Sequence, residues 1–344
     1  MFNRAGLVSG LIPLAVLLTL AAFYSRLRAG LRAVITIPAG LFSMAVGAGE
    51  AGYYSLQVAP SGDDYTGLLA LAAGYLVLFP LALSYVFAHS ARAAVPSPQL
   101  GASYENVSFT TSDGLTLNGW YVPSKNRAAV IAAPGRAGSQ RPARVLIRHG
   151  YGVLLFDRRG EGKSDGDPNA FGWGADKDLS AAVEFLQHRA DVDRNRIGGI
   201  GLSVGGETLL QTAAESDGLK AVVADGAGAR SLREDLARTG TGKWGEIPTS
   251  LVITAGTMLF SNHAAPPNLK SLVGRIAPRP VLFIYGQHDQ ANVRELTPGY
   301  FAAAGEPKAI WEVAGASHTG GIDAHPREYE QRAIAFFDHA LLTK

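Results

Sequence analysis

The pattern of apolar and polar positions divides the chain into two parts of different character. Before residue 90, long apolar stretches carry few charges; after residue 104, short apolar runs alternate with amphipathic segments. Long apolar stretches are typical of membrane helices, whereas alternating strands and helices are typical of a parallel sheet. The sequence therefore predicts a transmembrane helical region at 1–90, a linker rich in small residues at 91–103, and an α/β domain at 104–344.

The first region contains three apolar stretches, at 7–24, 33–48 and 68–88. The first and third are long enough to cross a bilayer, and the shorter middle stretch is a weaker candidate. An arginine cluster lies between the first two stretches, and acidic residues lie between the second and third. The positive-inside tendency then predicts three spans and a cytoplasmic C-terminal domain, in the plasma membrane of a bacterium. The alternatives are a cleaved signal peptide at 1–24 and helices buried in a soluble domain.

In the second region, strand-like runs alternate with helical segments, which predicts a largely parallel sheet with an antiparallel hairpin at one edge. Residues 227–279 interrupt the alternation, and we interpret them as a small cap, with a plain crossover as the alternative. The predicted strands are Glu105–Thr110, Leu115–Val122, Ala128–Ala133, Gly152–Phe156, a strand ending at Gly201, Ala221–Ala224, Val281–Tyr285 and Ala309–Val313. The predicted helices are Arg141–His149, Asp176–Arg189, Gly205–Glu215 and Glu328–Leu342.

One serine stands in a context that favours nucleophilic chemistry. Ser203 lies between Gly201 and Gly205, after an apolar strand and before a helix. This is the pattern of a nucleophile elbow, in which side chains at the flanking positions would collide with the sharp turn. The turn would place the hydroxyl at a helix N-terminus, where backbone N–H groups favour developing negative charge.

A serine hydroxyl needs a base, and the base needs a carboxylate to hold its tautomer. His318 follows the last predicted strand and Asp289 follows the strand before it, so both side chains should reach the carboxyl edge of the sheet. The order Ser203, Asp289, His318 is that of an α/β-hydrolase triad. Asp225, which follows another strand, is a rival acid.

The oxyanion formed during acyl transfer needs two backbone N–H donors. Val204, directly after the candidate nucleophile, would supply one. The other should come from the loop after the strand Ala128–Ala133. There Pro134 has no N–H, which leaves Arg136 as the candidate donor. The Arg136 side chain is either solvated or placed to favour anionic substrates.

Several motifs together resemble those of the α/β-hydrolase superfamily, in its Bem46-like and dienelactone-hydrolase-like branch. They are the hairpin at 111–114, the loop from Asp157 to Gly166, the elbow at 201–206, and the segments 286–289 and 317–318. The resemblance covers about residues 104–342 and leaves the membrane region outside. It implies that Ser203, Asp289 and His318 act as nucleophile, acid and base, and that the Asp157–Gly166 loop is chiefly structural. Pro134-Gly135 departs from the His-Gly of many members.

Composition narrows the functional classes. The 344 residues include 47% hydrophobic and 17% charged residues, a net charge of +2 and no cysteine. Without a basic block the sequence does not indicate nucleic-acid binding, and without cysteine it excludes thiolate chemistry and disulfides. We expect a membrane-anchored serine esterase that needs no metal or cofactor. Its expected substrates are small acyl compounds, among them compounds derived from lipids. The alternatives are an acyltransferase, a thioesterase or peptidase with the same triad, and a non-catalytic membrane binding protein.

Overall fold

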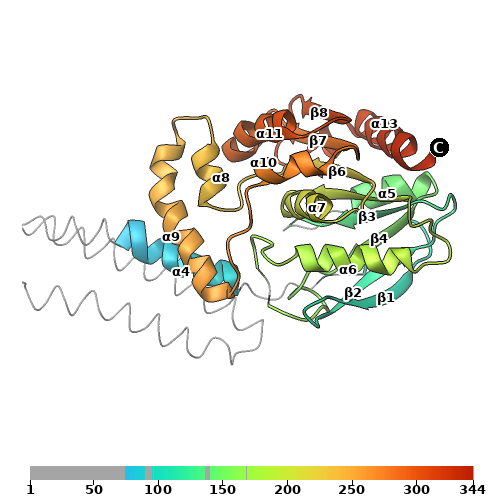
Figure 1. Ribbon diagram of the computed structural model, residues 1–344, viewed down its shortest axis with the longest axis horizontal. Coiled ribbons are helices and arrows are strands. Elements are labelled where there is room, and N and C mark those ends of the chain that lie inside the picture. The colour runs from blue at the N-terminus through green and yellow to red at the C-terminus, as the bar shows by residue number, and fades with distance from the viewer. Residues whose placement is uncertain (1–73, 90–94, 96, 136–139, 168, 344) are drawn as a thin grey trace, which may run out of the picture. The chain divides into compact units, whose positions relative to one another are not determined.

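The computed structural model describes residues 74–343, apart from 90–94, 96, 136–139 and 168 (Figure 1). The predicted spans at 7–24 and 33–48 lie outside the described residues. The described end of the third stretch forms η1 (Gly74–Leu78) and α4 (Phe79–Ala88). Among the helices in the described ranges, none combines the length and apolar character needed to cross a bilayer.

The chain forms two compact units, and their division differs from the predicted boundaries. One unit comprises Met1–Arg92 together with Pro248–Asn262, and the other comprises Ala93–Ile247 and His263–Lys344. The segment predicted as a cap therefore contributes to both units. We describe each unit by itself.

The larger unit contains one sheet of eight strands in the order β1-β2-β4-β3-β5-β6-β7-β8 (Figure 1). The pairs β1–β2 and β2–β4 are antiparallel, and every other neighbouring pair is parallel. This confirms the predicted sheet with its antiparallel hairpin at one edge. The strands are β1 (Glu105–Thr110), β2 (Thr116–Val122), β3 (Ala129–Ala133), β4 (Gly152–Phe156), β5 (Ile197–Leu202), β6 (Ala221–Asp225), β7 (Val281–Gly286) and β8 (Lys308–Val313).

Helices cover both faces of this sheet, because the parallel strands are apolar on both sides. On one face, α6 (Asp176–Gln187), α7 (Val204–Glu215), α10 (Leu269–Leu272), η2 (Val273–Ile276) and α11 (Ala291–Ala303) supply the core. On the other, α5 (Arg141–Arg148), α12 (Gly321–Ala324), α13 (Pro326–Phe337) and η3 (Asp338–Leu342) do so. The predicted helices are confirmed, with ends that differ by a few residues.

The connection between β6 and β7 contains four helical elements rather than a single crossover helix. They are α8 (Leu232–Ala237), α9 (Lys243–Ser261), α10 and η2. The last two pack on α7 and close the crossover, since Leu269, Val273 and Ile276 belong to the core of that face. The longest, α9, begins in the larger unit and continues into the smaller one.

The smaller unit contains a close contact between α4 and α9. A Cβ added at Gly256 would overlap the Ser84 hydroxyl, and the rings of Tyr85 and Phe260 meet edge-on at 5.2 Å. Ser84 satisfies its buried hydroxyl within α4 by donating to the Leu81 carbonyl at 2.7 Å. The small residues Ser84 and Gly256 thus let the two helices approach closely.

Candidate active site

Ser203 occupies the sharp turn between β5 and α7. Its φ of 52° and ψ of −122° lie outside the regions that residues with side chains normally adopt. Such strain persists only where surrounding contacts over-determine the backbone, and it is concentrated at functional sites. The Ser203 N–H donates to the Asp225 carbonyl at 2.7 Å, which ties the turn to β6.

The glycines that flank Ser203 are required sterically. A Cβ at Gly201 would overlap the backbone of Gly205, and a Cβ at Gly205 would overlap the carbonyl group of Ala133. Because both neighbours are backbone atoms, no side-chain rotation could relieve the overlap. The steric expectation from the sequence is confirmed at both positions.

The structure brings the side chains of Ser203, His318 and Asp289 together. His318 lies in the loop after β8, and its Nε2 is 2.9 Å from the Ser203 Oγ. Its Nδ1 is 2.7 Å from Oδ1 of Asp289, which lies in the loop after β7. In this arrangement the ring can accept the serine proton at one nitrogen while the carboxylate holds the proton on the other.

The Asp289 side chain is fully buried, and backbone N–H groups donate hydrogen bonds to both of its carboxylate oxygens. Oδ1 accepts from the Gln290 N–H at 2.7 Å, and Oδ2 accepts from the Gly286 N–H at 3.2 Å. These bonds fix the carboxylate in the orientation that His318 meets. A side chain at Gly286 would overlap the carbonyls of Ala316 and Ser317, so this glycine allows the two loops to touch.

The electrostatic surroundings of His318 favour its protonated form. The hydrogen bond and charge of Asp289 raise the pKa of His318, and burial opposes this only in part. An imidazolium formed when the ring takes the serine proton is therefore stabilised. The ring remains 27% exposed, so it can exchange protons with water.

Asp225, the rival acid, has a different partner. It ends β6, is almost wholly buried, and its Oδ2 accepts a hydrogen bond from the Tyr329 hydroxyl at 3.0 Å. Burial raises the pKa of Asp225 to about 7, although the bond from Tyr329 opposes the shift. His318 Nδ1 is bonded to Asp289 rather than to Asp225.

Of the two predicted oxyanion donors, the structure describes Val204 and does not describe Arg136. Val204 is the first residue of α7, where helix geometry leaves the N–H without a partner inside the helix. The chain leaving β3 runs against the same turn, because a Cβ at Gly135 would lie 2.9 Å from the Leu202 carbonyl oxygen. Arg136, the next residue, lies outside the described residues, so its N–H stays a prediction.

Gly226 is a site residue that the sequence analysis missed. Its φ is +74°, and a Cβ there would lie 3.0 Å from Cε1 of His318 and 2.9 Å from Cγ2 of Thr319. The residue therefore lets the His318 loop close over the end of β6. A glycine directly after an acidic residue at the end of a buried strand is the signal that could have identified it.

The loop from Asp157 to Gly166 is held by hydrogen bonds within it and by ion pairs to α6 and to the turn between β1 and β2. Asp157 Oδ2 accepts from the Lys163 N–H at 2.9 Å, and the Ser164 hydroxyl donates to the Asp157 carbonyl at 2.7 Å. The buried Arg159 pairs with Asp178 and Asp113 at 2.6 and 3.1 Å.

Within the described ranges, no group of three or more His, Asp or Glu side chains is arranged to hold a metal ion.

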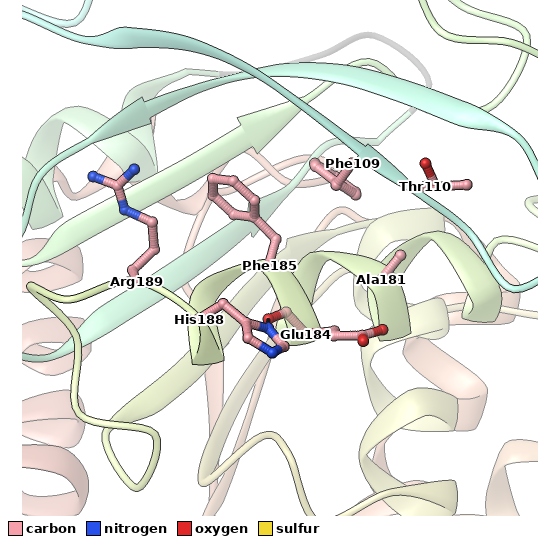
Figure 2. Close-up of a pocket in the computed structure, with 7 residues that line it drawn as sticks. All are labelled: Phe109, Thr110, Ala181, Glu184, Phe185, His188 and Arg189. Carbon is pink, nitrogen blue, oxygen red and sulfur yellow. Dashed lines mark hydrogen bonds between the residues drawn. The ribbon is translucent and has the colours of Figure 1, made fainter.

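A cavity of about 340 Å³ lies between β1 and α6 (Figure 2). Phe109, Phe185 and Arg189 line it, and none of the candidate triad residues does. The Arg189 guanidinium is paired with Glu105 and Asp191 and stacks over the Tyr121 ring at 4.5 Å. The positive charge of Arg189 is therefore balanced by carboxylates of the protein itself. The cavity is separate from the Ser203 site.

A serine, a carboxylate and a histidine in this order along the chain, at the carboxyl edge of a mostly parallel eight-stranded sheet, define an α/β-hydrolase. Within this class, the chain belongs to the X-Pro dipeptidyl-peptidase (S15) family, whose profile matches residues 103–319.

Curated relatives and solved structures of the same fold are also similar to this chain. The Escherichia coli K12 protein YfhR is 27% identical over 252 residues, covering 70% of this chain and 82% of YfhR. The Mycobacterium tuberculosis protein Rv2307c is 33% identical over 215 residues, covering 60% and 70%. The Pyrococcus furiosus esterase Pf2001 matches with a TM-score of 0.58 at 25% identity, covering 73% of this chain and 98% of the esterase. The α/β hydrolase GrgF of Penicillium shares the fold, with a TM-score of 0.56 at 24% identity over 70% of this chain and all of GrgF.

Proposed function

We propose that the protein is a membrane-anchored serine hydrolase that cleaves carboxylic esters through an acyl-enzyme at Ser203. The observation that carries the proposal is the position of His318, hydrogen-bonded to Ser203 on one side and to Asp289 on the other. That arrangement activates a hydroxyl for attack on a carbonyl carbon.

The reaction follows from the geometry in two halves. In the first, His318 Nε2 takes the Ser203 proton as Oγ bonds to the acyl carbon, and the same proton passes to the leaving alcohol as the ester C–O bond breaks. In the second, a water molecule gives a proton to His318 and adds to the acyl carbon. The bond to Ser203 then breaks, the carboxylic acid leaves, and Ser203 regains its proton. Asp289 holds the proton on His318 Nδ1 and stabilises the imidazolium in both halves.

Negative charge on the carbonyl oxygen needs donors in each tetrahedral intermediate. The N–H of Val204 is one, because it begins α7 directly after the nucleophile. The N–H of Arg136 is the proposed second, since the preceding Gly135 lies against the nucleophile turn.

Ester cleavage is favoured over the alternatives by the match to the Pyrococcus furiosus esterase along almost its whole length. Peptide-bond cleavage is the second candidate, because the family profile is that of X-Pro dipeptidyl-peptidases. Acyl transfer is a third, since the polyketide transferase GrgF is 34% identical over 134 residues, covering 35% of this chain. All three reactions use the same acyl-enzyme and differ in the leaving group or the acceptor.

The membrane anchor is proposed from the apolar stretches 7–24, 33–48 and 68–88 and from the charges between them. In this proposal the catalytic unit lies on the cytoplasmic side of a bacterial plasma membrane and works beside lipid-derived acyl groups. We also propose that the chain belongs to the Bem46-like and dienelactone-hydrolase-like branch of the superfamily, because of its motifs at 157–166, 201–206 and 286–289.

The substrate class is tested with p-nitrophenyl esters of graded acyl length alongside Xaa-Pro p-nitroanilides, using the full chain and its Ser203→Ala variant. We expect ester turnover that depends on chain length and is lost in the variant. Preferred cleavage of the anilides would instead assign a peptidase. Product analysis with competing alcohols separates hydrolysis from acyl transfer.

A further inference from the structure

The strongly exposed large apolar side chains of the described ranges gather in two parts of the chain. One group lies in η1 and at the start of α4, and the other in α8 and α9. Single exposed apolar residues are normal on a protein surface, but a gathered set marks an interaction site. The residues are Leu76, Val77, Leu78, Phe79, Leu236, Trp244, Leu251, Met258 and Leu259.

In α9, the exposed apolar side chains lie on one face of the helix. Leu251, Met258 and Leu259 are 52%, 45% and 72% exposed, and Trp244 is 65% exposed. Spacings of seven residues from Trp244 to Leu251 to Met258 return to the same side of a helix. The stripe extends for roughly 21 Å at 1.5 Å per residue.

The other side of α9 is used for packing within its own unit. Gly256 lies against Ser84 of α4, and the Phe260 ring meets the Tyr85 ring at 5.2 Å. The exposed stripe is therefore a second apolar face, separate from the one that holds the helix on α4. A helix that is apolar on both sides differs from the amphipathic helices that normally meet water.

Charge along α9 is confined to its beginning. Lys243 and Glu246 lie in the first turns, whereas Pro248–Asn262 contains no Asp, Glu, Lys, Arg or His. The Lys243 ammonium lies 5.2 Å from the centre of the exposed Trp244 ring. A tryptophan beside a lysine, followed by a charge-free segment, is the arrangement found where a helix passes from water into the headgroup region of a bilayer.

We propose that the exposed face of α9, formed by Leu251, Met258 and Leu259, inserts into the surface of a lipid bilayer. This rests on the proposed membrane anchor and names a second contact with the membrane, from the connection between β6 and β7. The charge-free segment extends roughly 22 Å, which is short of the ~30 Å hydrocarbon core. The helix therefore lies at the interface rather than crossing the membrane.

Two features support lipid as the occupant of this face. Pro248–Asn262 clusters with Met1–Arg92, the part of the chain that contains the predicted spans. The other exposed apolar group, Leu76–Phe79, belongs to the apolar stretch 68–88 in that same unit. Both exposed groups thus adjoin sequence whose composition is that of a membrane protein.

The test uses the absence of native cysteine in the chain. Single variants Leu251→Cys, Met258→Cys and Leu259→Cys of the full chain are labelled with the fluorophore NBD and reconstituted into vesicles of phosphatidylethanolamine and phosphatidylglycerol. Lys270→Cys, at an exposed residue of α10 in the other unit, is the matched control. Fluorescence is compared with and without lipids that carry a doxyl quencher on the acyl chain.

We expect blue-shifted emission and several-fold stronger doxyl quenching at the three α9 positions than at Lys270→Cys. Blue-shifted emission without doxyl quenching would mean that protein covers the face, from a second copy or another segment of the chain, and would overturn the proposal. Emission typical of water, with quenching by iodide, would also overturn it.

Vesicle flotation of the same samples separates this proposal from the one on which it rests. If the protein floats with the vesicles while the α9 probes are not quenched by doxyl lipid, the anchor stands and the inference about α9 falls. If the protein does not float, the anchor itself fails. Hydrolysis of p-nitrophenyl butyrate by the same samples reports the proposed chemistry independently of either result.

Discussion

The Tyr329 hydroxyl donates a hydrogen bond of 3.0 Å to Oδ2 of Asp225. This bond gives a buried carboxyl a partner of its own at the end of β6, close to the loop that carries His318. Asp289 is then the carboxylate that meets the His318 ring. Two acids therefore lie near one histidine with different hydrogen-bond partners, and several predictions depend on that difference.

Removing the charge from each acid should have unequal effects on catalysis. Asp289→Asn replaces the acceptor that holds the His318 tautomer, and we expect kcat to fall by about 10⁴-fold. Asp225→Asn keeps a side chain of the same shape beside Tyr329, and we expect a loss of no more than about tenfold. Steady-state hydrolysis of a p-nitrophenyl ester measures both. A larger loss in Asp225→Asn than in Asp289→Asn would assign the acid role to Asp225.

The pH profile should report His318. The ring acts as a base only when neutral, so kcat/KM should rise with pH through the pKa of His318, which Asp289 raises above its ordinary value. Asp225 raises the pKa of His318 further where its own carboxyl, with a pKa of about 7, is ionised. In Asp225→Asn that contribution is absent, so the acid limb of the profile should move to lower pH. An acid limb that moves to higher pH would contradict this account.

Stability should depend on pH through Asp225. Burial raises its pKa in the folded protein to about 7 from an ordinary value of 3.8. Between these values the folded state binds more protons than the unfolded state, so this carboxyl lowers stability as pH rises from about 4 to 7. Asp225→Asn does not titrate, and its unfolding temperature relative to wild type should increase between pH 5 and pH 8. Thermal unfolding in detergent at both pH values measures the difference, and a relative decrease would contradict the prediction.

A methyl group at Gly226 should lower kcat beyond what the loss of folding stability explains. Its Cβ would lie 3.0 Å from His318 Cε1, so the ring would have to shift, and we expect Gly226→Ala to lower kcat by about 10–100-fold. Gly114→Ala is the matched control, because Gly114 has a φ of +83° and open space around its would-be Cβ. Both variants strain a positive φ, at about 1–3 kcal/mol of unfolding free energy. Equal activity in the two variants would refute a positioning role for Gly226.

Local patterns in the sequence predicted most of the sheet and the three residues Ser203, His318 and Asp289 that the structure brings together. Continuous apolar runs defined β3, β4, β6 and β7, because a strand buried on both faces cannot tolerate polar residues. The motif context of Asp289, at the end of Gly286-Gln287-His288-Asp289 after a predicted strand, favoured it over Asp225. The sequence could not predict the bond from Tyr329, which lies 104 residues beyond Asp225 and meets it only through the packing of α13.

The boundaries of the two compact units were less predictable from the sequence than the strands of the sheet. The sequence predicted a small cap at 227–279, and Pro248–Asn262 within that segment belongs to the smaller unit. That boundary depends on how Gly256 and Phe260 pack against α4, and such contacts between distant segments leave no periodic signal. Gly226 was missed for the same reason, since its role is set by the approach of the His318 loop.

The central claim, that Ser203 is an activated nucleophile, is tested most directly by covalent labelling with a fluorophosphonate. The full chain should acquire one phosphonyl group, located by mass spectrometry on the peptide that contains Ser203. Labelling should be abolished in Ser203→Ala and strongly slowed in Asp289→Asn. Labelling that persists in Ser203→Ala, or wild-type protein that hydrolyses esters without being labelled, would contradict the account.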